Sequence, residues 1–214
     1  MTNFVPIFPL SLVVYPGEYL NLHIFEPRYK QLINECYPEG KAFGIPTVIN
    51  NKLNEWGTLV KVIEIVRVSQ NGEMDIRATG LSVFRILEVI KSVPEKLYSG
   101  AIVNYPENSE DAGKAELMLK VVNAMRELHR LLRITKTFPK ADSELRAYDI
   151  AHHAGLSLEE EYELLRLLRE EQRQEYLKRH LSRVIPVIAE METLKERVKL
   201  NGHFKNLSSF EFED

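Results

Sequence analysis

The sequence predicts an α+β protein in which a β-rich region precedes a bundle of helices. Two observations predict this class. Apolar residues alternate over much of residues 4–105, and Asn71-Gly72 separates two long runs rich in β-branched residues. After residue 113 the apolar spacing changes to three and four, which is typical of amphipathic helices. We therefore expect three regions: a β-rich subdomain (1–106), a helical bundle subdomain (113–200) and a tail (201–214).

Composition narrows the function classes. The 214 residues are 44% hydrophobic and 28% charged, with a formal net charge of -3. This charge provides no overall positive field for phosphate backbones, so nucleic acid is an unlikely partner. Cys36 is the single cysteine, which excludes an intramolecular disulfide and favours a reducing, cytoplasmic setting. Prolines interrupt the apolar N-terminus, so we expect neither a signal peptide nor a membrane span.

The stretch PGEYLNLHIFEPRY, residues 16–29, predicts a turn, a strand and a helix start in quick succession. Pro16-Gly17 is a turn signal. Alternation in the following strand places three aliphatic side chains on one face and three aromatic ones on the other. The aliphatic face holds Leu20, Leu22 and Ile24, and the opposite face holds Tyr19, His23 and Phe25.

Glu26-Pro27 then predicts the helix start, because proline at the first helical position loses no hydrogen bond. Apolar residues follow at helical spacing up to Cys36. Glu26 and Arg28 lie close enough in sequence for a local ion pair, which is a structural role; a ligand-reading role for the pair is the alternative.

The Asn71-Gly72 pair predicts a hairpin with a type I′ turn, which requires positive φ at both residues. Gly80 interrupts the returning strand, which indicates a β-bulge, and we expect positive φ there as well. Long arms and a bulge together favour a small barrel over a flat ribbon.

Two helical patterns follow. One apolar stripe runs through Leu117, Val121, Met125, Leu128 and Leu132. Ser157 and Glu160 form a capping box that opens a longer helix through Leu181, and the apolar stripe continues to Val198. We expect the helices to break near Pro186, because proline removes one backbone donor.

Motifs that carry chemistry are missing from the sequence. There is no P-loop, no HExxH and no GxSxG elbow. His152 and His153 are adjacent, so on a helix their side chains diverge and cannot easily share a metal. Cys36 has no recognisable base beside it in the sequence. The sequence therefore predicts no catalytic residue, no metal and no cofactor.

The segment FPLSLVVYPGEYLNLHIFEPRY resembles the signature that opens the substrate-binding, N-terminal domain of Lon-type ATP-dependent proteases, in its stand-alone bacterial form, which is related to a domain of cereblon. Later marks align too. They are Phe43-Gly44-Ile45 as the next strand, Gly57-Thr58 before the long strand, Asn71-Gly72, and Gly80 with Phe84-Arg85-Ile86. Motifs are specific over residues 4–105 and looser over 113–200. Asn21 replaces a common proline and Tyr15 a usual phenylalanine.

The resemblance implies a PUA-like β-barrel followed by a helical bundle, and a role in binding unfolded polypeptide or a partner protein, an ATP-dependent protease among the candidates. It implies no catalytic residue. The 214 residues hold neither an ATPase module nor a serine-lysine protease domain, so proteolysis is not carried over.

Our leading hypothesis is a non-enzymatic peptide-binding module that uses Tyr19, His23 and Phe25, unless the helices cover that face. An RNA-binding PUA-like protein is one alternative, although the β-rich region offers only scattered basic residues: Lys52, Lys61, Arg67, Arg77, Arg85 and Lys91. A small-ligand-binding protein or an enzyme on the same barrel is the other. Failing these, the helices or the tail from Phe204 to Phe212 would carry the binding surface.

Overall fold

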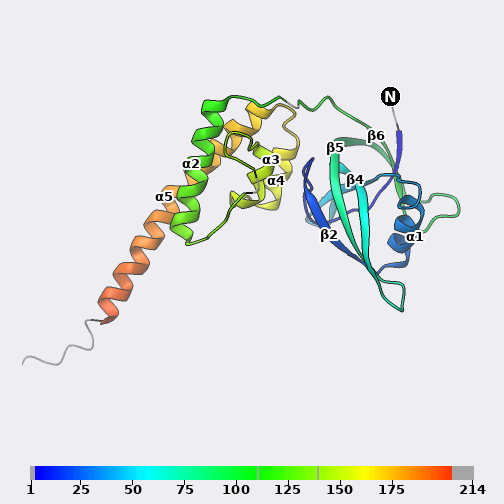
Figure 1. Cartoon of the computed structure of the whole chain (residues 1–214), viewed down its shortest axis with the longest axis horizontal. Coiled ribbons are helices and arrows are strands. Elements are labelled where there is room, and N and C mark those ends of the chain that lie inside the picture. Colours follow the sequence, from blue (N-terminus) through cyan, green and yellow to red (C-terminus); the bar gives the residue numbers. More distant parts are fainter. Residues whose placement is uncertain (1–2, 110, 139, 204–214) are drawn as a thin grey trace, which may run out of the picture.

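The computed structural model describes residues 3–109, 111–138 and 140–203. It shows an α+β protein with an antiparallel sheet and several helices, which confirms the predicted class. Figure 1 shows the β-rich residues 3–104, here called the sheet part, beside the helical residues 115–203, here called the helical part. The predicted division near residue 106 falls in the segment that connects them.

The sheet part contains six strands and one helix: β1 (Asn3–Pro6), β2 (Tyr19–Ile24), α1 (Pro27–Cys36), β3 (Phe43–Ile49), β4 (Lys52–Val68), β5 (Met74–Ile90) and β6 (Gly100–Asn104). The strand order is β1-β6-β5-β4-β3, and all paired strands are antiparallel. β2 pairs with the first part of β5, from Met74 to Thr79. Gly57-Thr58, expected before the long strand, instead lies inside β4.

The ends of this sheet meet only through single bridges. Ile7 bridges Gly44 and Leu10 bridges Thr47, both in parallel, just after β1. Among the described residues no continuous ladder joins β1 to β3, so the sheet curls on itself without closing. The β-rich class is therefore confirmed, whereas the closed PUA-like barrel is not what the pairing gives.

Helix α1 covers the interior of the curled sheet. It begins at Pro27, as predicted, with Glu26 at the N-cap position. Its buried side chains are Tyr29, Leu32, Ile33 and Cys36, which pack in one cluster with strand residues such as Phe43 and Ile76. The helical spacing in the sequence thus marks the face that completes this core.

The hairpin between β4 and β5 is confirmed, but its turn type was wrong. Gly72 has a φ of 74°, while Asn71 is not in the positive-φ region. Gly72 N–H donates to Ser69 O (2.9 Å), and Ser69 N–H donates to Glu73 O (2.8 Å). This is a type I turn followed by a left-handed glycine, the usual three-residue hairpin connection. The Asn71 side chain accepts from the Ser69 hydroxyl (2.5 Å), which favours the wider loop.

The bulge at Gly80 is confirmed, and its cause differs from the expected one. Val60 pairs with Gly80 and Leu59 with Ser82, so Leu81 is the extra residue. The φ of Gly80 is not positive. A Cβ at this position would instead lie 2.2 Å from Tyr15 O, so only glycine admits the turn that packs against the strand.

The helical part contains α2 (Ala115–Leu132), α3 (Ala147–Ile150), a short 3-10 helix η1 (Ala151–His153), α4 (Leu158–Leu165) and α5 (Glu170–His203). The predicted stripe of α2 is buried at Val121, Met125 and Leu128, and it packs in one cluster with Leu177 and Leu181 of α5. Leu117 and Leu132 lie at the margins of this stripe, and Leu132 is exposed.

The capping box is confirmed: Glu160 N–H donates to Ser157 Oγ (3.2 Å) and Ser157 N–H donates to Glu160 Oε2 (3.0 Å). The position of the helix break was wrong. The chain leaves the helix between α4 and α5, where Leu167 O accepts from Arg173 Nη1 (3.0 Å) and Leu168 O accepts from Ser109 N–H (2.7 Å). These partners replace helical hydrogen bonds. α5 continues through Pro186, which forfeits a single backbone donor.

Candidate peptide-binding surface

Strand β2 presents two different faces. Ile24 is buried, and Leu20 and Leu22 are partly buried against the core, as their alternation predicted. On the opposite face Tyr19 is 72% exposed, and Phe25, just after the strand, is 57% exposed. The helical part therefore does not cover these aromatic side chains, so the condition that would have excluded this face as a binding surface is not met.

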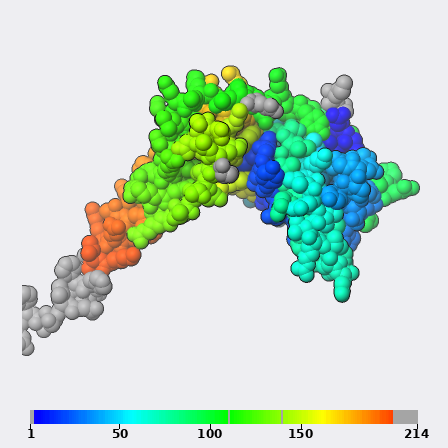
Figure 2. All heavy atoms as spheres, viewed as in Figure 1, coloured from blue at the N-terminus to red at the C-terminus, as the bar shows by residue number. Residues whose placement is uncertain are grey.

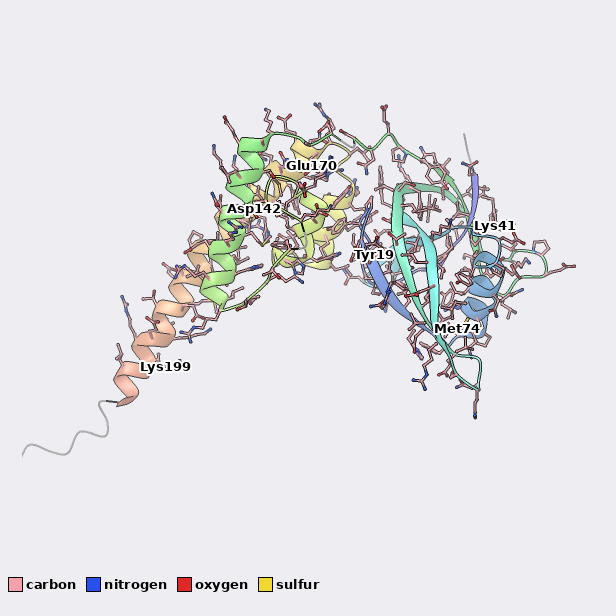
Figure 3. All side chains as sticks on the ribbon, in the orientation of Figure 1. Tyr19, Lys41, Met74, Asp142, Glu170 and Lys199 are labelled. Atoms are coloured by element: carbon pink, nitrogen blue, oxygen red, sulfur yellow. The ribbon has the colours of Figure 1, made fainter. Side chains whose placement is uncertain are left out.

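The structure brings together two of the three predicted binding residues. His23 and Phe25 have ring centroids 6.0 Å apart. His23 Nδ1 lies 2.7 Å from Asp75 Oδ1 on β5, and its Nε2 lies 3.6 Å from Glu73 Oε2. Tyr19 lies at the other end of β2. It is four residues from His23, which is about 13 Å at the usual rise of a strand. Figure 3 shows Tyr19 on the side of the sheet part that faces the helices.

Neighbouring strands add polar groups to this outer face. Asn21 pairs with Arg77, which pairs in turn with Glu64, and the Arg77 Nη1–Glu64 Oε1 distance is 2.6 Å. Bulges in β4 leave Ile63 and Val66 unpaired and exposed. Neither residue could be predicted from the sequence, because a bulge breaks the alternation of buried and exposed positions. The surface is polar at its centre, with apolar side chains around it.

The predicted structural residues of the opening stretch hold β2 in place. Gly17 has a φ of 84°, and its N–H donates to Gly80 O (2.9 Å), while Gly80 N–H donates to Glu18 O (2.9 Å). The turn at Pro16-Gly17 is thus tied to the bulge at Gly80. After the strand, Arg28 Nη2 lies 2.7 Å from Glu26 Oε2, which is the predicted local ion pair.

His152 joins the helical part to the start of β2. Its Nδ1 lies 2.7 Å from Glu161 Oε1, and its Nε2 lies 3.1 Å from Glu18 Oε2. Burial lowers the pKa of His152, but hydrogen bonds to these two carboxylates outweigh burial and raise the pKa to about 9. The imidazolium is therefore charged at neutral pH and links the two parts. No sequence signal joins residues so far apart in the chain.

A second set of junction contacts surrounds Tyr15. Its hydroxyl donates to Glu161 O (3.1 Å), and its ring stacks on Tyr148 with centroids 4.8 Å apart. Trp56 N–H donates to the Tyr162 hydroxyl (3.2 Å). In Figure 2 a hollow separates the two parts on their lower side, and the blue N-terminal residues lie at its inner end.

A cavity of about 450 Å³ also lies at the junction, lined by Pro16, Gly17 and residues of the helical part. Four charged side chains in its wall form two ion pairs, and a fifth, Arg146, donates its Nη1 to Asp111 O (2.6 Å). Lys140 Nζ lies 2.6 Å from Asp149 Oδ1, and Arg173 Nε lies 2.9 Å from Glu170 Oε2. These pairs use the charges that a small ionic ligand would need.

The described residues give little support for a cysteine nucleophile, a metal site or a basic surface. Burial raises the pKa of the Cys36 thiol to about 11, so the thiolate needed for nucleophilic attack is scarce at neutral pH. Over the described ranges, no cluster of three or more histidine, cysteine or acidic side chains could hold a metal ion. Two of the scattered basic side chains, Arg77 and Arg85, are paired with Glu64 and Glu55.

A helix that spans a membrane must be long and predominantly apolar. In the part of the chain that the structure describes, no helix is both long enough and apolar enough to cross a bilayer.

Two solved structures and a family model that match this chain belong to the same family. A crystal structure of a Lon N-terminal domain protein from Xanthomonas campestris is 25% identical to this chain, with a TM-score of 0.63; the match covers 82% of this chain and 96% of that one. The N-terminal domain of Mycobacterium avium complex Lon protease shares the fold, with 15% identity, a TM-score of 0.59 and coverage of 84% and 98%.

The family model for the substrate-binding domain of ATP-dependent protease La (Lon) matches residues 5–183, which is most of the chain. This matched region spans the sheet part and the helical part up to the middle of α5. The matched domain is the substrate-binding one and is not itself catalytic. The chain belongs to the Lon substrate-binding domain family.

Proposed function

We propose that this chain is a non-enzymatic module that binds unfolded polypeptide through the outer face of β2, and that it acts as an adaptor that presents such polypeptide to a partner such as an ATP-dependent protease. The observation that carries the proposal is the exposure of Tyr19 and Phe25 on a strand whose other face is built into the core. Membership of a substrate-binding family supports it.

The chemistry of the surface suits polypeptide better than the alternatives. Aromatic side chains supply much of the contact energy in protein interfaces, because they are large and rigid. The polar groups between them, such as His23, Asp75 and Arg77, can exchange their present partners for backbone groups. An RNA surface needs a patch dominated by cations, whereas this face mixes acidic with basic groups: Arg77 is paired with Glu64, and His23 lies against Asp75.

We further propose that residues 1–106 and 113–200 work as two subdomains, the first a PUA-like barrel completed by the bridges at Ile7 and Leu10. Residues 7–10, which follow β1, contact β3: Phe8 N–H donates to Gly44 O (2.8 Å) and Val48 N–H donates to Leu10 O (2.8 Å). These hydrogen bonds support the barrel. The sheet part would present the binding face, and the helical part would orient it.

The test measures capture of a permanently unfolded, carboxymethylated model protein together with thermal stability. We expect Tyr19→Ala and Phe25→Ala each to weaken capture at least about tenfold, as loss of an aromatic anchor does. His23→Ala should weaken capture less. All three should change stability by less than about 0.5 kcal/mol, because the side chains are exposed.

Leu97→Ala is the matched control, since Leu97 is 66% exposed in a loop outside this face. Tyr19→Phe, which keeps the ring, should retain capture. Capture that survives Tyr19→Ala combined with Phe25→Ala would exclude this face as the binding surface.

A further inference from the structure

Residues 190–200 of α5 are largely exposed, and none of them belongs to a hydrophobic core cluster of the described residues. Leu177 and Leu181 are fully buried, and Val184 and Ile188 pack partly against the same cluster. Beyond Ile188 the side chains become largely exposed. Figure 1 shows why: α5 continues past the end of α2 and projects away from the rest of the molecule.

This projecting segment carries a narrow apolar stripe. Its members are Val187, Met191, Leu194 and Val198, and each is between 51% and 62% exposed. Their spacing of four, three and four is that of the d and a positions of a coiled coil. At 100° per residue the four side chains fall within about 60° of one another on the helix surface. Leu200, which is equally exposed, lies on the opposite side.

Charges beside the stripe indicate what fits it. With Met191 and Val198 at a positions, Glu190 occupies a g position and Lys195 the following e position. In a parallel two-stranded coil, g faces e of the next heptad on the partner helix. Two copies of α5 would therefore place Glu190 of each opposite Lys195 of the other. Within one chain Lys195 contacts Glu192 (2.5 Å), in a solvent-exposed pair that can exchange.

From these observations we propose that α5 pairs with α5 of a second copy of this chain, as a parallel coiled coil through residues 187–198. The seam is short and the area it buries is below that of a standard stable interface, so the dimer forms at high micromolar concentration and dissociates on dilution. The proposal is independent of polypeptide capture, because the stripe lies on the end of α5 that projects away from the sheet part and β2 (Figure 1).

Sedimentation velocity of the full chain over a series of concentrations tests this pairing. We expect a reversible monomer–dimer equilibrium, and Leu194→Asp should abolish the dimer while leaving helix content and the melting midpoint unchanged. Leu200→Asp, on the same helix but outside the stripe, is the matched control and should preserve it. A wild-type chain that stays monomeric at millimolar concentration, or a dimer that tolerates Leu194→Asp, would overturn the proposal.

Charge reversal tests the parallel arrangement separately. Glu190→Lys and Lys195→Glu should each raise the dissociation constant several-fold, because like charges then face each other across the seam. The double variant should restore the wild-type value, since the swapped charges again match. Failure of the double variant to restore dimerisation would exclude the parallel register and refute the proposal as stated.

Discussion

The two parts of the molecule fix their irregular segments in different ways. In the sheet part the buried polar side chains are the two threonines Thr47 and Thr58, and the backbone is held by strand ladders and turns. In the helical part the buried polar side chains are larger or charged: His129, Glu170, Arg173, Gln174 and His180. All five lie in the two long helices, α2 and α5, and each hydrogen-bonds to a segment outside these helices.

Arg173 illustrates the second arrangement. Its Nε pairs with Glu170 Oε2 (2.9 Å), its Nη1 donates to Asn108 Oδ1 (2.7 Å), and its Nη2 donates to Ser109 O (3.1 Å). Glu170 Oε1 accepts from Ala147 N–H (2.7 Å). One buried ion pair in α5 thus anchors both the connecting segment and the start of α3.

Gln174 continues this anchoring. Its Oε1 accepts from Lys114 N–H (3.0 Å), and its Nε2 donates to Ala112 O (3.0 Å). Backbone groups in a connection without regular pairing must find other partners when buried. The sheet part therefore depends on close packing of its backbone, whereas the helical part depends on a few buried polar side chains.

Gly80→Val should reduce stability the most, because it disturbs the close backbone packing around Gly80. The added Cβ would lie 2.2 Å from Tyr15 O, so the Pro16-Gly17 turn must move off the strand. We expect a loss of more than about 4 kcal/mol in the free energy of unfolding, or no folded protein. Thr79→Val, at the neighbouring strand position, should be nearly neutral. Equal chemical denaturation curves for the two variants would contradict this account.

Arg173→Leu should come next, by removing one partner of a buried ion pair. Leaving Glu170 charged and unpaired costs about 3 to 5 kcal/mol, measured by urea denaturation. Arg173→Leu combined with Glu170→Leu should recover part of that loss. Arg77→Leu breaks the exposed pair with Glu64 and should cost less than about 1 kcal/mol. Similar losses from Arg173→Leu and Arg77→Leu would remove the contrast between the two parts.

The smallest of the three effects concerns the junction at His152. Because its pKa is raised to about 9, the charged ring stabilises the fold fully below about pH 6.5, and this contribution is lost as pH rises through 9. Wild type should therefore exceed His152→Gln in stability by about 2 kcal/mol at pH 6, and the difference should shrink by pH 10. A difference that stays constant from pH 6 to pH 10 would show that His152 acts through packing.

Much of the sheet part could be predicted from local sequence. The Asn71-Gly72 hairpin, the start of α1 at Pro27 and the alternation in β2 each depend on residues near one another in the chain. The type of the turn could not be predicted, because the Asn71 side chain bonds Ser69 and the sequence does not reveal that contact.

Long-range contacts set the limits of the prediction. The glycine at position 80 was recognised as special, but the reason is a distant backbone oxygen of Tyr15. The helix break lies between α4 and α5 because Ser109 and Arg173 take the released carbonyls there. For the candidate surface, sequence supplied Tyr19, His23 and Phe25, while Ile63 and Val66 emerge only from bulges in β4. The tail from Phe204 onward lies outside the described residues.

The position of Leu177 and Leu181 has a consequence for synthesis of the chain. All strands of the described residues lie within residues 3–104, so we expect the sheet part to begin folding once that segment has left the ribosome. The helical part must wait, because its core and the anchor at Arg173 are both supplied by α5, the last helix to be made. During translation we therefore expect the outer face of β2 to form before the helical part is complete.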